Sequence, residues 1–159
     1  MRPIVIASSS ALTELYASYL MTEGFDAVVE VMDGLQCMNV IRQQHPEVLI
    51  LDERLPWGGA SGVMAVLRQE FSWMPCSVIL IGTAGCEQRM IAEQRWPVVA
   101  CLQKPFRLDQ LSDLLHRVTA VPARARTGTV LREMIVRNRH ERLSEKMRAF
   151  SSVPEEILS

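Results

Sequence analysis

Short apolar runs recur along the first two thirds of the chain, and each is about as long as one buried strand. Their residues are mostly Val, Ile and Leu at consecutive positions, which is typical of a parallel sheet that is covered on both faces. We therefore predict strands at residues 4–7, 27–31, 48–51, 78–81 and 98–102.

Apolar residues at helical spacing fill the intervals between these strands. Since Ser and Asp are typical caps, we predict one helix from Ser9 or Ser10 to Gly24 and a second from Asp33 to just before Pro46. Further helices are predicted over about residues 61–71, 85–94 and 108–118. The first helix is expected to turn a row of apolar side chains inward, namely Leu12, Leu15, Tyr16, Tyr19 and Leu20. This alternation of strands and helices predicts a doubly wound α/β fold.

The composition is that of a folded domain, because 48% of the 159 residues are hydrophobic and 22% are charged. These values exclude a wholly disordered or collagen-like chain. No segment approaches the roughly 18 apolar residues of a membrane helix, so we expect no membrane span and a cytoplasmic location.

The four cysteines are Cys37, Cys76, Cys86 and Cys101, and none of them forms a CxxC pair. Zinc-binding sequences usually show such a pair, so we do not predict a metal centre there. We expect all four to be reduced thiols, as is usual in the cytosol.

The small net charge of −1 conceals two regions of opposite sign. Residues 1–120 carry a formal charge of −4, and residues 121–150 carry +5. We therefore divide the chain into an α/β domain at 1–119, a polar linker at 120–128, and a basic amphipathic helix with its tail at 129–159.

The predicted C-terminal helix has a narrow apolar seam, which includes Val136, Leu143, Met147 and Phe150. A lone helix of this length is marginally stable in water, so we expect it to pack on a partner. Three roles are open: formation of a homodimer, docking on its own domain, or contact with nucleic acid or a membrane surface. The homodimer is favoured over the nucleic-acid role.

Polar side chains follow the predicted strands at the points where function collects in a doubly wound sheet. Asp52 ends the third strand, Thr83 follows the fourth, and Lys104 follows the fifth. A carboxylate can accept a phosphoryl group, which an ammonium and a hydroxyl can then bind. The three residues together therefore indicate a phosphoryl group on Asp52.

Three segments carry a resemblance to a known family: Leu-Ile-Leu-Asp at 49–52 with Pro56, Ile-Gly-Thr-Ala at 81–84, and Lys-Pro-Phe at 104–106. Over residues 2–119, the chain resembles the response-regulator receiver domain of two-component signalling. The resemblance implies a flavodoxin-like sheet of strand order 2-1-3-4-5. It also implies that a sensor histidine kinase or phosphotransfer protein phosphorylates Asp52, with Thr83 as the switch hydroxyl and Lys104 as the phosphate contact.

The chain departs from the family pattern at several positions. Members of the family usually have two acidic residues directly after the first strand, which bind Mg²⁺ together with the acceptor Asp. This chain has Ser8 and Ser9 at those positions. Because a hydroxyl is a poorer Mg²⁺ ligand than a carboxylate, we expect weak Mg²⁺ binding through Asp52. Cys101 stands where the family usually has a switch aromatic residue. We expect the Arg54 guanidinium to pair with Asp52 and to replace part of the missing positive charge.

These observations predict a signalling domain that acts through protein contacts and has no substrate turnover. Three functions remain open at this point. The domain is a receiver in a phosphorelay, a phosphorylation-independent pseudo-receiver that acts as a dimeric adaptor, or the regulatory part of a DNA-binding transcription regulator. An enzyme of another kind is disfavoured, because the sequence has no Gly-rich phosphate loop of recognised spacing.

Overall fold

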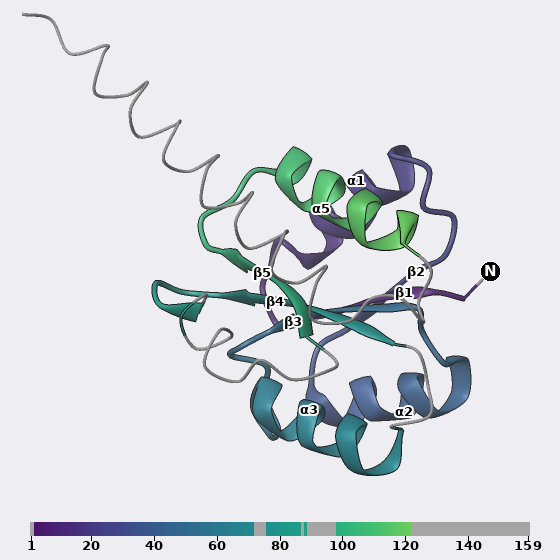
Figure 1. The fold of residues 1–159 in the computed structure, drawn as a ribbon, viewed down its shortest axis with the longest axis vertical. Helices are drawn as coiled ribbons and strands as arrows, with labels where there is room; N and C mark the ends of the chain where they lie inside the picture. The colour runs from purple at the N-terminus through teal and green to yellow at the C-terminus, as the bar shows by residue number, and fades with distance from the viewer. Residues whose placement is uncertain (1, 72–75, 87, 89–97, 122–159) are drawn as a thin grey trace, which may run out of the picture.

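The fold is built on one parallel sheet of five strands (Figure 1). The computed structural model describes residues 2–71, 76–86, 88 and 98–121. Its strands lie in the order β2-β1-β3-β4-β5, which confirms the prediction. Their bounds are β1 Ile4–Ala7, β2 Val28–Val31, β3 Val48–Asp52, β4 Ser77–Gly82 and β5 Val98–Gln103.

Helices cover both faces of the sheet (Figure 1). α1 (Thr13–Thr22) and α5 (Leu108–Ala120) lie on one face, and α2 (Gly34–Gln44) and α3 (Gly59–Glu70) lie on the other. Most of the helix predicted at 85–94 lies outside the described residues. So do nearly all of the linker and all of the predicted C-terminal helix with its apolar seam. No helix in the described ranges is both long and apolar enough to cross a membrane.

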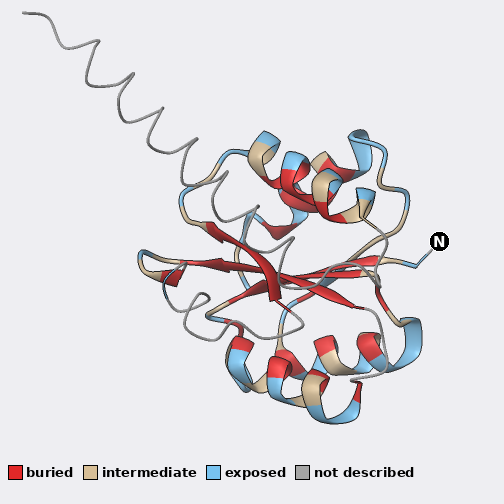
Figure 2. Ribbon diagram, in the orientation of Figure 1, coloured by how far each residue is buried: buried red, intermediate tan, exposed pale blue. Residues whose placement is uncertain are grey.

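The core consists of two apolar layers, one on each side of the sheet (Figure 2). β1, β3 and β4 are buried at every position, as their continuous apolar sequences predict. β2 is less buried, and its Glu30 is exposed, because this strand forms one edge of the sheet. Every residue of β5 except Gln103 is buried, although this strand forms the other edge.

The start of α1 differs from the prediction. Leu12 and Leu15 are each 50% exposed, whereas Thr13, Tyr16 and Leu20 are buried. The Thr13 hydroxyl donates to the Ser10 carbonyl oxygen at 2.8 Å, so the chain makes a tight turn before the helix begins. As a result, Leu12 occupies the N-cap position without a side-chain cap, and the prediction of a Ser9 or Ser10 cap was wrong.

The start of α2 agrees with the prediction. Asp33 lies at the N-cap, and its carboxylate accepts a hydrogen bond from the Gln36 N–H at 2.8 Å. A cap of this kind satisfies one of the backbone donors that the first helical turn leaves unpaired. The helix ends at Gln44, with His45 in the left-handed conformation just before Pro46.

Candidate functional site

The parallel strands bring polar residues together at one edge of the sheet. β3 ends at Asp52, and the residues that follow β1, β4 and β5 reach the same edge. Asp52 is only 5% exposed. A buried carboxylate needs hydrogen-bond or charged partners to offset the loss of hydration.

The Asp52 carboxylate has three described partners. The Lys104 ammonium lies 2.6 Å from Oδ2, and the Ser8 hydroxyl donates to the same oxygen at 3.1 Å. The Arg54 backbone N–H donates to the other oxygen, Oδ1, at 3.0 Å. The structure therefore brings Ser8 and Lys104 to Asp52 from two other strands, and both carboxylate oxygens are bound.

The backbone places Lys104 within reach of Asp52. Its N–H donates to the Gly82 carbonyl oxygen at 2.8 Å, which continues the pairing of β4 and β5 beyond the end of β5. The Lys104–Pro105 peptide bond is cis. The Lys104 side chain is 33% exposed and that of Asp52 is 7% exposed, so the ion pair lies at the boundary between the core and the solvent.

The two serines after β1 have different environments. Ser8 is 2% exposed, and its Oγ accepts from the Ser10 N–H at 3.1 Å while it donates to Asp52. Ser9 is exposed, and no hydrogen bond joins Ser9 to Asp52 within the described part of the chain. Only one of the two predicted positions therefore belongs to the site.

The prediction for Arg54 was wrong in its geometry. The Arg54 side chain is exposed, and the residue reaches Asp52 through its backbone N–H. The reason is local: the Leu55 N–H donates to the Asp52 carbonyl oxygen at 3.2 Å, which forms a turn. Within this turn, the Arg54 backbone N–H points toward the carboxylate. Among the described ion pairs, the cation paired with Asp52 is Lys104.

Thr83 follows β4 and is half-buried. Its carbonyl oxygen accepts from the Cys86 N–H at 3.1 Å. Its hydroxyl is not one of the described contacts of Asp52, so the structure places Thr83 at the predicted edge without joining it to the carboxylate.

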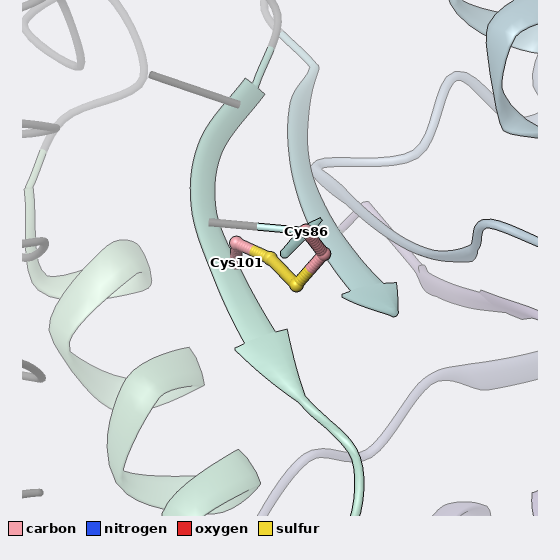
Figure 3. The surroundings of a disulfide bond; sticks show 2 residues. All are labelled: Cys86 and Cys101. Atoms are coloured by element: carbon pink, nitrogen blue, oxygen red, sulfur yellow. A yellow bond between two sulfur atoms is a disulfide. The ribbon is translucent and has the colours of Figure 1, made fainter. Parts of the chain in front are cut away.

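The cysteines divide into two groups, and the prediction that all four are thiols was wrong. Cys86 and Cys101 form a disulfide with Cα atoms 6.9 Å apart, and Figure 3 shows it beside β5. The fifteen-residue separation gives no local signal, and only the pairing of β4 with β5 brings the two together. Cys37 and Cys76 are thiols, as predicted, and both are buried. Burial, followed by the nearby Asp33 carboxylate, raises the pKa of the Cys37 thiol to about 12.

Tyr16 is a site neighbour that the sequence analysis placed only in the core. Burial raises the pKa of its phenol, and the negative charge of Asp52 raises this pKa further. The ring of Phe106 packs against it, with centroids 5.4 Å apart. Phe106 follows Lys104 by two residues, so this ring contact joins α1 to the segment that carries Lys104.

The donors around Asp52 do not fit a Mg²⁺ site of the usual kind. Mg²⁺ prefers oxygen ligands with carboxylates among them. The described residues contain no group of three or more Asp, Glu, His or Cys side chains that could hold a metal ion. Moreover, Oδ2 of Asp52 already binds a cation, the Lys104 ammonium.

A five-stranded parallel sheet of order β2-β1-β3-β4-β5, covered by helices on both faces, defines a flavodoxin-like domain of the α/β class. The chain belongs to the family described as the response regulator receiver domain, whose model matches residues 4–116. It is thus a receiver domain of two-component systems, a regulatory class of domain.

The chain is also similar in sequence to a known response regulator. The DNA-binding response regulator MtrA of Mycolicibacterium paratuberculosis is 33% identical over 69 residues, which is 43% of this chain and 30% of that protein. The match thus spans less than a third of the length of this curated relative.

Two solved structures have the same fold. A sensor protein from Polaromonas sp. JS666 matches with a TM-score of 0.66 and 20% identity, over 76% of this chain and 98% of that one. A DNA-binding response regulator of the LuxR family from Staphylococcus aureus matches with a TM-score of 0.63 and 22% identity, over 74% and 98%. At these identities, the two structures support the fold alone.

Proposed function

We propose that this chain is a receiver that takes a phosphoryl group on Asp52 from a sensor histidine kinase or a phosphotransfer protein, with little dependence on Mg²⁺. The main support for this proposal is the 2.6 Å contact between the Lys104 ammonium and Asp52 Oδ2. This contact supports the proposal, because a positive charge beside the acceptor oxygen would stabilise the negative charge that develops on an acyl phosphate.

In the proposed reaction, an Asp52 oxygen attacks the phosphorus of a phosphohistidine. The new P–O bond forms while the P–N bond breaks, and the imidazole leaves and takes up a proton. Lys104 then binds a phosphoryl oxygen, since a charge-assisted hydrogen bond to phosphate is a strong one. Thr83 supplies a hydroxyl donor from the end of β4 after a local movement, as the resemblance implies.

Ser8 explains why Mg²⁺ has a smaller role in this proposal. An acidic pair beside Asp52 adds negative charge, which repels a phosphoryl group and which a divalent cation offsets. The buried Ser8 hydroxyl instead donates a hydrogen bond to Asp52 and adds no charge. The site therefore lacks both the ligands for the cation and much of the repulsion that the cation relieves.

The test is the intact mass of the protein after incubation with acetyl phosphate, once with Mg²⁺ and once with excess EDTA. The proposal expects a gain of one phosphoryl group in both samples, at rates within about tenfold of each other. Asp52→Asn is the control and should gain nothing. Phosphorylation that requires Mg²⁺ would contradict the reduced role of the cation, and a gain on Asp52→Asn would contradict Asp52 as the acceptor.

A second function is favoured by how completely Asp52 is bound. Both of its oxygens have partners before any phosphoryl group arrives, which suits a domain held in one state. The chain would then be a phosphorylation-independent adaptor, with a homodimer formed through residues 129–150. No mass gain even with a phosphorylated phosphotransfer protein, together with a dimer lost on truncation at residue 121, would favour this function.

A third function, the regulatory part of a DNA-binding regulator, is supported by the relatives. MtrA is a DNA-binding response regulator, and the matched region covers 30% of its length. The charge of +5 on residues 121–150 of this chain also suits contact with an anionic partner. Salt-dependent DNA binding by the full chain, absent after truncation at residue 121, would favour it.

Each of these functions works through contact with another macromolecule, and the site edge offers apolar groups for it. Several large apolar side chains that follow β1, β2 and β3 are at least half exposed: Leu12, Leu15, Met32, Leu35 and Trp57. Exposed apolar groups around a polar site are typical of surfaces that bind proteins.

A further inference from the structure

The disulfide between Cys86 and Cys101 (Figure 3) joins two segments that are close in sequence to the residues of the proposed function. Cys86 comes three residues after Thr83, and Cys101 comes three residues before Lys104. The bond therefore joins the turn that leaves β4 to the strand that carries Lys104 to Asp52.

Gly82 connects this disulfide physically to the Asp52 site. A Cβ atom on Gly82 would lie 2.6 Å from the Cβ of Cys86, so the Cys86 side chain packs directly on the end of β4. The Gly82 carbonyl oxygen in turn accepts from the Lys104 N–H at 2.8 Å. A movement of the Cys86 side chain would therefore change its contact with Gly82 at the end of β4. Gly82 in turn holds the backbone of Lys104.

The bond also fixes the turn that contains Thr83. The Cys86 N–H donates to the Thr83 carbonyl oxygen at 3.1 Å, and Gly85 adopts a positive φ of 90°. In this disulfide-bonded form, the Thr83 hydroxyl is not one of the described contacts of Asp52. Cleavage of the bond would leave the turn held by weaker interactions, so that Thr83 could move toward Asp52.

The other two cysteines give an internal comparison. Cys37 and Cys76 are buried in the apolar layer on the side of α2 and α3, and neither is part of the disulfide. The described fold already has an apolar layer on each face of the sheet. Domains that depend on disulfides usually lack such a core, so a role in stability alone does not account for the one bonded pair.

We propose that Cys86 and Cys101 are a thiol–disulfide switch, in which reduction of the bond releases the Thr83 turn and changes the reactivity of Asp52. The reductant is a dithiol, such as dithiothreitol or a thioredoxin-class protein. One of its thiolates attacks a protein sulfur and breaks the S–S bond, and its second thiolate resolves the mixed disulfide. Two electrons and two protons end on Cys86 and Cys101, and the reductant leaves as a disulfide.

Access to the bond requires a local opening, because Cys86 is 0% exposed and Cys101 is 4% exposed. In the turn just before Cys86, Ala84 is exposed and Gly85 is half-buried, so this turn borders the solvent. We expect reduction of the native protein to be at least tenfold slower than reduction of the urea-unfolded protein.

The first test counts thiols in the full chain across a series of glutathione ratios. Each sample is quenched in acid, unfolded, alkylated with a maleimide and weighed intact. We expect two labels, on Cys37 and Cys76, in oxidising samples and four labels in reducing samples. At a total glutathione concentration of about 10 mM, the change should fall at a reduced-to-oxidised ratio between about 1 and about 1,000, where regulatory pairs titrate and structural ones stay oxidised.

Two results of this titration would overturn the proposal. Four labels at every ratio would mean that the pair does not form, and two labels at every ratio would mean a permanent structural bond. The Cys86→Ser variant should give three labels throughout, while Cys37→Ser, the matched control, should change from one label to three at the same ratio as the wild type.

The second test measures whether the bond state reaches the Asp52 site. Hydrogen exchange is followed by mass spectrometry in oxidised and reduced wild type, for peptides that contain Gly82 and Lys104. We expect exchange at least tenfold faster after reduction, and equal exchange would overturn the coupling. Because this comparison uses the wild-type chain, it stands even if the Cys86→Ser variant fails to fold.

The effect on Asp52 chemistry rests on the proposed phosphorylation, whereas the two tests above do not. Acetyl phosphate is therefore added to the oxidised and the reduced protein, and the rates are compared. A difference of at least threefold that disappears in Cys86→Ser is expected. Equal rates in the two states would overturn the link between the disulfide and Asp52. Absence of phosphorylation in both states would contradict the proposed function, and the two redox tests would still show whether the disulfide is a switch.

Discussion

The ion pair between Lys104 and Asp52 is the most informative contact to perturb. Lys104→Met keeps most of the side-chain volume and removes the ammonium that lies 2.6 Å from Asp52 Oδ2. At an effective dielectric constant of about 20, two unit charges at that separation attract by about 6 kcal/mol. The cost of desolvating both groups offsets most of this attraction.

Solvent reduces the net effect further, because the Lys104 side chain is 33% exposed. An exposed pair contributes roughly 0–1 kcal/mol, whereas breaking a fully buried pair costs about 3–5 kcal/mol. This contact lies between the two cases, so we expect Lys104→Met to lower the free energy of unfolding by about 1–3 kcal/mol. Ser8 and the Arg54 N–H remain to bind the Asp52 carboxylate, which keeps the loss below the fully buried value.

The assay is urea unfolding at pH 7 of the wild type, Lys104→Met, Asp52→Asn and the double variant. Asp52→Asn removes the charge that Lys104→Met leaves unpaired. The double variant should therefore be more stable than the two single effects predict, with a coupling energy of about 1–2 kcal/mol. Additive effects within about 0.5 kcal/mol would refute the reasoning, because they would show that the pair contributes nothing beyond its separate members.

Three further predictions test other parts of the site and core. Ser8→Ala removes a buried hydroxyl that bonds both Asp52 and a backbone N–H, so it should cost about 1–3 kcal/mol in urea unfolding, while the exposed Ser9→Ala should cost less than about 0.5 kcal/mol. Gly82→Ala places a Cβ 2.6 Å from the Cβ of Cys86, and a lower melting temperature, equivalent to about 1–3 kcal/mol, is expected by calorimetry. The pKa of Cys37 is raised from 9.0 to about 12, so the unfolded chain releases this proton first as the pH rises. The stability that the protonated thiol contributes should be complete below pH 9 and lost progressively up to about pH 12. If the Cys37→Ala variant lost the same stability over that pH interval, the loss could not be assigned to Cys37.

Much of the fold could be predicted from local patterns alone. Continuous apolar runs predicted β1, β3 and β4, since a strand that is covered on both faces has no polar face to present. The Asp33 cap was correct because a helix cap is a contact between residues three positions apart. The start of α1 was wrong, because a turn held by the Thr13 hydroxyl changed which side chains face the core.

The candidate site divides in the same way. The ends of the strands brought Asp52 and Lys104 to one edge, and the chain order of the motifs was enough to predict that meeting. Whether Ser8 or Ser9 reaches Asp52 depends on the direction in which the chain leaves β1. The Arg54 guanidinium was expected at Asp52, but the turn after β3 placed the backbone N–H there.

The sequence by itself determined the class of the domain, the order of its strands and the identity of the central carboxylate and its lysine. The class of the domain and its site residues follow from apolar periodicity and from residues at strand ends, which are local properties of the chain, and the strand order follows from the resemblance to the receiver family. Only the tertiary structure decided that Ser8 and the Arg54 N–H are the other partners of Asp52, and that Cys86 and Cys101 form a bond. Such contacts depend on strand pairing, which places Leu80 opposite Cys101, and the spacing of residues along the chain carries no record of that alignment.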